Sequence, residues 1–68
     1  MVNTNKLKAR LALAGYTQDR LAKEVNMSIN NLNCKINGRA IFNCDEVDSI
    51  CKVLGIENPV EKAEIFLA

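Results

Sequence analysis

Histidine is absent from this 68-residue sequence, and its three cysteines, Cys34, Cys44 and Cys51, form no CxxC pair. A zinc site needs closely spaced cysteine or histidine ligands, and a nucleophilic thiol needs a neighbouring base. The sequence therefore predicts no metal site, no cofactor, no small-molecule substrate and no enzymatic activity. An odd number of cysteines without ligand spacing favours reduced thiols in a cytoplasm, with Cys44 and Cys51 as small apolar residues in or near the core.

Long apolar runs, aromatic residues and prolines are also scarce. The aromatic residues are Tyr16, Phe42 and Phe66, and Pro59 is the only proline. No run approaches the roughly 20 apolar residues of a membrane-spanning helix, and no basic segment followed by an apolar one resembles a secretory signal. The alternation of apolar and polar residues that is typical of a half-buried strand is missing too. The sequence therefore predicts a single all-α domain over residues 1–68, neither exported nor membrane-bound.

Charge is nearly balanced over the whole chain, at +1, but it is unevenly distributed. Residues 1–42 carry seven basic and two acidic residues, a net charge of +5, whereas residues 43–68 carry two basic and six acidic residues, a net charge of −4. A basic half suits a surface that faces a polyanion such as nucleic acid. Charge alone leaves open the alternative that these residues are simply solvated.

Apolar spacing and capping residues predict five helices. The first runs from about Thr4 to Ala14, and Gly15 ends it. Three further helices begin near residues 17, 28 and 43, because each start has a capping residue between two apolar residues that form a hydrophobic staple. These apolar pairs are Tyr16 with Leu21, Met27 with Leu32, and Phe42 with Val47.

The last two predicted helices carry further boundary signals. Asn43 and Glu46 fit a variant of the capping box, and Gly55 ends that helix. Asn58 caps the final helix, with Pro59 at its first position. The expected core of this five-helix bundle consists of Leu7, Leu11, Leu21, Ala22, Val25, Leu32, Ile36, Ile50, Leu54 and Phe66.

Residues 17–37 have the spacing of a helix-turn-helix. Asn26 falls at the corner, where a left-handed backbone is needed, and Asn adopts this conformation more readily than other non-glycine residues. The small side chain of Ala22 allows the two helices to cross closely, and Val25 and Leu32 meet beneath them. Such a motif places its second helix in the major groove of DNA.

The second helix of the motif, over residues 28–37, has an outward face with little charge. At about 100° per residue, the positions of Leu32 and Ile36 coincide on the inward side, whereas another side carries Asn30, Asn33, Cys34 and Asn37, with Ile29 at its edge. An asparagine amide can bond to both N6 and N7 of adenine, and an apolar side chain can contact a thymine methyl. The predicted base-reading residues are therefore Ile29, Asn30, Asn33 and Cys34. The alternative interpretation is that the asparagines are ordinary exposed polar residues.

Phosphate contacts are expected at both ends of the motif's helices. Thr17, Gln18 and Ser28 lie at helix starts, where free N–H groups and the helix dipole favour an anion. Plain helix capping is the competing role for the two hydroxyl residues, although both roles are compatible. At or beyond the end of the second helix, the expected phosphate ligands are Lys35, Asn37 and Arg39, and Gly38 is expected to end the helix with a positive φ.

These residues resemble the phage repressor and Cro family of helix-turn-helix proteins. The segment that leads into the motif is similar to the family pattern LKxxLxxxGxTQ at Leu7, Lys8, Leu11, Gly15, Thr17 and Gln18. Residues 42–56 resemble the family's fourth helix. Two residues depart from the family pattern: Asn26 replaces the usual corner glycine, and Cys34 replaces a longer polar residue. The motif itself is similar at Gln18, Leu21, Ala22, Val25, Ser28, Leu32, Asn37 and Gly38.

The resemblance implies a lambda-repressor-like five-helix bundle that binds a double-stranded DNA operator as a homodimer. It implies phosphate contacts by Gln18 and Asn37, and base contacts by Ile29, Asn30 and Cys34. It also implies a transcriptional regulator of the bacterial cytoplasm that is associated with the nucleoid. Because the chain ends without an additional cleavage or ligand-sensing domain, the resemblance favours a small Cro-like repressor of a phage or prophage.

Two further expectations concern partners. One recognition helix reads about 4–5 bp, too few to select a site in a genome, so we expect a dimer on two half-sites about 34 Å apart. The apolar C-terminal end, Ile65–Leu67, is the expected contact surface. The alternative function is a protein-binding module of the same fold, such as an antitoxin or anti-regulator that uses its acidic C-terminal helix, since fold alone does not define function.

Overall fold

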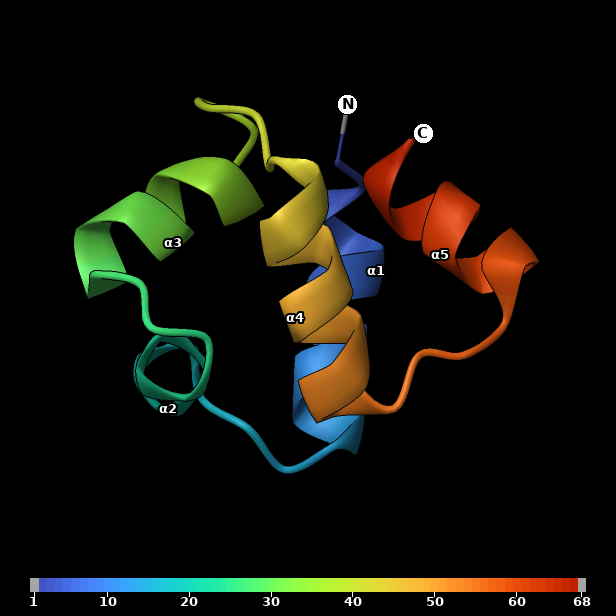
Figure 1. Cartoon of the computed structure of the whole chain (residues 1–68), viewed down its shortest axis with the longest axis horizontal. Coiled ribbons are helices and arrows are strands. Elements are labelled where there is room, and N and C mark those ends of the chain that lie inside the picture. Colours follow the sequence, from blue (N-terminus) through green and yellow to red (C-terminus); the bar gives the residue numbers. More distant parts are fainter. Residues whose placement is uncertain (1, 68) are drawn as a thin grey trace.

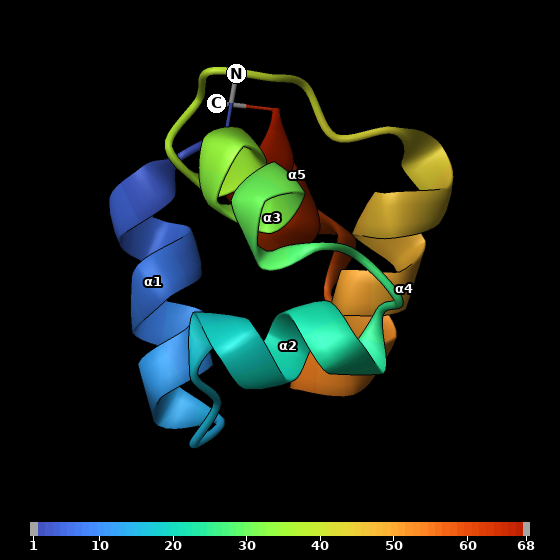
Figure 2. The same cartoon turned by 90° about the vertical axis from the view of Figure 1, so that its left-hand side faces the viewer.

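Five α-helices joined by short connections make up the computed structural model, which describes residues 2–67 (Figure 1). In chain order they are α1 (Thr4–Leu13), α2 (Gln18–Glu24), α3 (Ile29–Ile36), α4 (Cys44–Leu54) and α5 (Pro59–Phe66). No strand occurs among these described residues, and the predicted all-α fold class is confirmed. Helices α1 and α4 form opposite sides of the bundle, with α2 and α3 packed across one end and α5 at the other (Figures 1 and 2).

Side-chain caps determine where the helices begin. The side chains of Thr17, Ser28 and Asn43 accept hydrogen bonds of 3.1, 3.1 and 2.8 Å from backbone N–H groups three residues ahead. The carboxylate of Glu46 in turn accepts the N–H of Asn43 at 2.9 Å, which completes a capping box. Asn58 caps α5, whose first residue is a proline. The helix starts predicted from these residues are confirmed.

A residue with a left-handed backbone follows each of the first three helices. Gly15, Asn26 and Gly38 have φ angles of 73°, 59° and 79°. At each position the N–H of the next residue donates to a carbonyl five residues earlier, which is the Schellman arrangement that satisfies free carbonyls at a helix end. The donor–acceptor pairs are Tyr16 to Leu11 at 2.9 Å, Met27 to Ala22 at 2.8 Å, and Arg39 to Cys34 at 2.8 Å.

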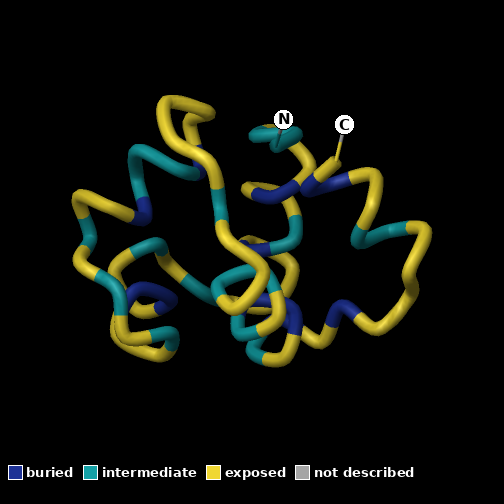
Figure 3. Tube along the Cα trace, turned by 45° about the horizontal axis from the view of Figure 1, so that its top comes forward, coloured by how far each residue is buried: buried dark blue, intermediate teal, exposed yellow. Residues whose placement is uncertain are grey.

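One hydrophobic core joins all five helices, and the tube in Figure 3 shows buried positions on every helix. Val25, predicted to be buried, is only half-buried and packs against this core. Ile56 and Ile65 are 4% and 1% exposed and were not in the predicted set; Ile56 lies in the α4–α5 connection, where no helical periodicity indicates an inward position. The buried residues are Leu7, Leu11, Leu21, Ala22, Leu32, Ile36, Ile50, Cys51, Leu54, Ile56, Ile65 and Phe66.

The two cysteines of α4 have different environments. Cys51 is 7% exposed, as expected, and burial is the main reason that the pKa of its thiol is raised. The predicted burial of Cys44 is wrong, because its side chain is exposed. The inward stripe of α4 begins with Val47, which packs against the core, whereas Cys44 precedes this stripe by nearly one turn.

Polar contacts tie α1 to the rest of the bundle. The Thr4 hydroxyl donates a 2.6 Å hydrogen bond to the carbonyl of Ile36 at the end of α3. Nη2 of Arg10 donates a 3.0 Å hydrogen bond to the carbonyl of Leu54 at the end of α4. Nε of the same arginine lies 3.4 Å from a carboxylate oxygen of Glu61 in α5. These contacts join α1 to three other helices.

Candidate nucleic-acid interface

Helices α2 and α3 form the most extensively packed helix pair of the described chain. The side chain of Ala22 is 3% exposed, and its small size leaves room for this packing. Asn26, with its φ of 59°, turns the chain between the two helices, and the flanking residues Val25 and Met27 pack against the core. Two helices and a tight turn therefore occupy the residues at which a helix-turn-helix was predicted.

Helix α3 presents one buried face and one polar face. Leu32 and Ile36 are both 0% exposed and fix the helix to the core. Asn30 and Asn37 are exposed, as the helical spacing predicts, whereas Asn33 is half-buried. The three amides are uncharged, so they offer hydrogen-bond donors and acceptors without a net charge.

The remaining positions predicted to read bases are less accessible. Ile29 and Cys34 are both half-buried, and Ile29 packs against the core. A half-buried side chain has only part of its length available for contact with a ligand. Among the four predicted base-reading residues, Asn30 is therefore the most accessible.

The end of α3 is closed by its own cap. Nδ2 of Asn37 donates a 2.9 Å hydrogen bond to the carbonyl of Asn33, which uses one of the two amide hydrogens. The carbonyl oxygen of this side chain and the second hydrogen stay available. Arg39, one residue beyond the positive-φ Gly38, is exposed and follows directly from the closed helix end.

The predicted phosphate ligands at helix starts are arranged as caps. The side-chain oxygens of Thr17 and Ser28 accept backbone N–H groups, and both residues are exposed. A hydroxyl that accepts a hydrogen bond still has its proton to donate, so capping leaves each of them a donor for an anion. Gln18, the first residue of α2, is half-buried.

Lys35 differs from the expectation that its ammonium is free. Its Nζ lies 2.6 and 2.7 Å from the two carboxylate oxygens of Glu46, and the two side chains are each 18% exposed. Burial alone raises the pKa of Glu46, but hydrogen bonds from Lys35 and the backbone of Asn43, together with the charge of Lys35, outweigh burial and lower that pKa. The side chain that sequence reasoning assigned to phosphate is thus engaged within the protein.

The charge asymmetry between the two halves of the chain is partly neutralised by ion pairs. Three basic residues of the basic half bind carboxylates of the acidic half, in the pairs Lys6–Glu64, Arg10–Glu61 and Lys35–Glu46. Lys8, Lys23 and Arg39 form no ion pair within residues 2–67 and are exposed. They are the cations of the basic half that are available to a polyanion, together with Arg20.

Sequence reasoning did not single out Arg20. Its guanidinium lies 4.5 Å from the centroid of the Tyr16 ring, where the electron-rich face of the aromatic group attracts a cation. The stacking holds the charge next to Thr17 and Gln18 at the start of α2. An arginine four residues after an aromatic residue at a helix start was the available signal.

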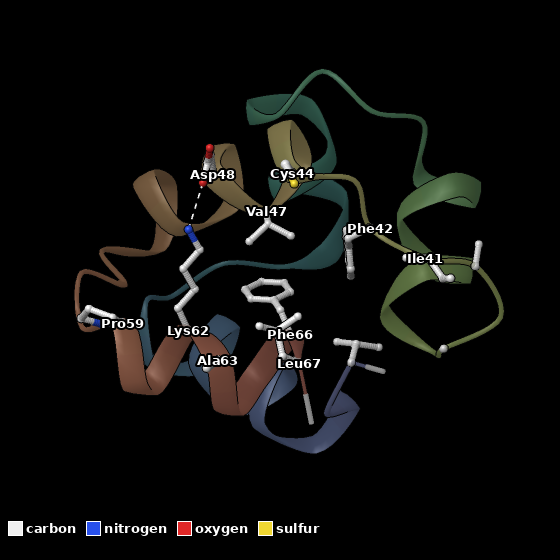
Figure 4. Close-up of a pocket in the computed structure, with 13 residues that line it drawn as sticks. Ile41, Phe42, Cys44, Val47, Asp48, Pro59, Lys62, Ala63, Phe66 and Leu67 are labelled. Atoms are coloured by element: carbon white, nitrogen blue, oxygen red, sulfur yellow. Dashed lines mark hydrogen bonds and ion pairs between the residues drawn. The ribbon is translucent and has the colours of Figure 1, made fainter.

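An apolar groove of about 570 Å³ lies beside the end of α3 (Figure 4). It is bounded by the α3–α4 connection, the start of α4 and the face of α5. The rings of Phe42 and Phe66 meet edge to face in it, with centroids 5.5 Å apart. On its rim, Ile41 and Leu67 are 90% and 78% exposed.

The predicted contact surface at the C-terminal end needs correction. Ile65 and Phe66 are only 1% and 8% exposed, so Leu67 alone of the three residues is on the surface. Helix α5 has apolar residues on several sides. The side that contains Ile65 and Phe66 faces the core. Val60, at 66% exposed, also points outward.

Residues 2–67 contain no group of three or more histidine, cysteine or acidic residues arranged to hold a metal ion. None of the helices in this part of the chain has the length and apolar character needed to cross a membrane.

Two capped helices joined by a tight turn, with exposed amides on the second helix, have the architecture of a helix-turn-helix domain. The family model of the Cro/C1-type HTH DNA-binding domain matches residues 6–59, which is more than half of the chain. The protein therefore belongs to this family, and the resemblance noted in the sequence is confirmed. Comparisons with curated proteins and with solved structures give no match.

Proposed function

We propose that the protein is a sequence-specific transcriptional regulator, a Cro-like repressor of a phage or prophage that reads the major groove of its operator with α3. The observation that carries this proposal is the exposed asparagine face of α3, which is held outward by the fully buried Leu32 and Ile36. Amide groups suit base edges, because each can donate and accept at once. A solvent-facing surface without such a role more often carries charge.

Asn30 has the leading role in this proposal. It lies in the first turn of α3, the part of a recognition helix that contacts base edges, and it is exposed. Its amide would bind N6 and N7 of an adenine. Ile29 would contact a thymine methyl beside it, and Asn33 and Cys34 would contact the next base pairs with their exposed atoms.

Phosphate contacts would set the register of α3 in the groove. The proposed ligands at helix starts are Thr17, Gln18 and Ser28, and those beyond the end of α3 are Asn37 and Arg39. Arg20, stacked on Tyr16, adds a positive charge beside the first group.

Selection of bound duplexes from a random pool tests the proposal. The wild-type protein should enrich a palindromic site, and Asn30→Ala should lose discrimination at one base pair per half-site, by about 1–3 kcal/mol. Asn31→Ala is the matched control, since Asn31 is exposed on the same helix but lies off the outward arc. Enrichment of no sequence would contradict the proposal, and a uniform loss with Asn30→Ala would assign Asn30 to phosphate.

We propose that a second copy of the chain occupies the apolar groove. A twofold dimer needs a patch that is complementary to itself, and this surface carries both a protruding side chain, Ile41, and a hollow lined by Val47, Phe66 and Leu67. The groove also follows α3 directly along the chain, through residues 38–42. A dimer at this surface would link the two reading helices closely.

Sedimentation equilibrium with and without operator tests the dimer. Ile41→Asp should shift the protein to monomer and weaken operator binding, because a charge at the rim opposes burial. Leu13→Asp is the control, since Leu13 is 76% exposed but does not line the groove. One wild-type chain per operator would contradict the dimer.

The groove also supports a second candidate function. An apolar surface of this kind suits a protein-binding module, such as an antitoxin or anti-regulator. Salt dependence separates the two functions. Binding to duplex DNA through six or more phosphates should weaken by about 10³-fold between 50 and 200 mM salt. Binding that is insensitive to salt and shows no preference for duplex would favour the protein partner.

A further inference from the structure

The ion pair between Lys35 of α3 and Glu46 of α4 is the shortest and the most shielded lysine–carboxylate pair of the described chain. Its N–O distances are 2.6 and 2.7 Å, and each side chain is 18% exposed. The Lys6–Glu64 pair, by comparison, has a distance of 3.3 Å and side chains that are 50% and 54% exposed. Water therefore screens the Lys35–Glu46 contact much less than that surface pair.

Glu46 is held in place independently of Lys35. One of its carboxylate oxygens accepts the backbone N–H of Asn43 at 2.9 Å, as part of the capping box of α4. The N-terminus of that helix also favours a negative charge. The capping box thus fixes the Glu46 carboxylate at this position, and Lys35 binds to it.

Lys35 belongs to the last turn of α3, next to the helix end where Asn37 and Arg39 are proposed to contact the DNA backbone. A carboxylate with two oxygens facing an ammonium offers it what a phosphate group would offer. Because an ammonium on DNA would have to leave both oxygens of Glu46, the two contacts compete.

We infer that Glu46 is an internal competitor of the DNA phosphate: it binds Lys35 and keeps this cation off the duplex. The inference rests on the proposed function, because it concerns the number of phosphate contacts that the regulator makes. Sequence-independent affinity comes from such contacts, so an engaged Lys35 lowers binding to random DNA. Glu46 is in this sense a positioning residue for the Lys35 side chain and a determinant of selectivity.

The salt dependence of binding to a random-sequence duplex reports this directly. Each phosphate that is neutralised by a cation adds about −0.9 to the slope of log K against log salt. Glu46→Gln should release Lys35 and steepen the slope by about 0.9 for each bound chain, which corresponds to about a 3.5-fold greater loss of affinity per chain between 50 and 200 mM salt. Glutamine is accepted at this capping-box position, so the helix start should persist.

Two further variants separate a released cation from a change in net charge. The double variant Lys35→Met with Glu46→Gln has the net charge of the wild type and should show the wild-type slope. Asp45→Asn makes the same charge change as Glu46→Gln one residue away, but Asp45 has no ion-pair partner within residues 2–67, so it should leave the slope within error of the wild type.

The outcomes distinguish this inference from the function on which it rests. A wild-type slope about 0.9 steeper than that of the double variant means that Lys35 already contacts phosphate, and it overturns the inference alone. Equal slopes for Glu46→Gln and wild type overturn it as well. Failure of the wild-type protein to bind any duplex overturns the proposed function and, with it, this role of Glu46.

Discussion

The hydroxyl of Thr4 donates a 2.6 Å hydrogen bond to the backbone carbonyl of Ile36, which joins the first turn of α1 to the last turn of α3. Carbonyls in the last turn of a helix lack an intrahelical partner, so this contact satisfies a group that the helix itself leaves free. Thr4 thus holds the end of the proposed reading helix, although it is 32 positions away from Ile36 in the sequence.

Thr4→Val keeps the shape of the side chain and removes the donor. We expect a loss of about 1 kcal/mol in the free energy of unfolding, because the Ile36 carbonyl loses its partner. Urea denaturation followed by circular dichroism measures this loss. Thr4→Ser, which retains the hydroxyl, should recover most of it, and equal stabilities of the valine and serine variants would show that the hydrogen bond contributes nothing.

Arg10→Met should destabilise the bundle by about 1–3 kcal/mol, because a charge-assisted hydrogen bond to the Leu54 carbonyl and the contact with Glu61 are both lost. Methionine retains much of the apolar stem, so the change isolates the guanidinium. Lys8→Met is the control at an exposed position and should stay within about 0.5 kcal/mol of the wild type. Similar unfolding midpoints for the two variants would contradict a structural role for Arg10.

Asn26→Ala places a residue that disfavours a left-handed backbone at a φ of 59°. The expected cost is about 1 kcal/mol, which lowers the melting temperature of a domain of this size by about 4–8 °C. Asn26→Gly should be as stable as the wild type or more stable, since glycine adopts this conformation without steric cost. Calorimetry on the three proteins gives the order, and a glycine variant less stable than the alanine variant would contradict the argument.

Glu46 makes stability depend on pH in acid. Its pKa in the folded protein is lowered from an ordinary value of 4.5, so the folded state binds its proton less readily than the unfolded state does. The resulting stabilisation is fully present above pH 4.5 and is lost as the pH falls through the lower folded-state pKa. Urea denaturation of wild type and Glu46→Gln from pH 7 to pH 3 should show a stability difference that shrinks below about pH 4.5. A difference that does not change with pH would exclude this linkage.

The helix boundaries were predictable because their signals are local. Thr17, Ser28 and Asn43 are caps whose hydrogen bonds span only three residues, and Asn26 takes the left-handed backbone expected of a corner. Such interactions depend on neighbours in the sequence, so the sequence contains them in full. The buried faces of α3 and α4 followed from helical spacing in the same way.

Contacts between helices were less predictable. Helix α5 carries apolar residues on several sides, so spacing could not decide that Ile65 faces the core and Leu67 the solvent. The packing of α5 against α1 decides it. The partner of Lys35 is on another helix, 11 residues away across an irregular connection. Periodicity indicates the side of α3 on which Lys35 lies. It does not indicate that the carboxylate of Glu46 lies beside it.

The close packing of α2 against α3, two helices that are adjacent in the chain, has a kinetic consequence. Only residues 25–28 connect the two helices, so little loop entropy is lost when they meet. Helical domains dominated by such local contacts fold in microseconds to milliseconds. A molecule that unfolds would therefore regain the proposed reading surface of α3 long before a new copy could be synthesised.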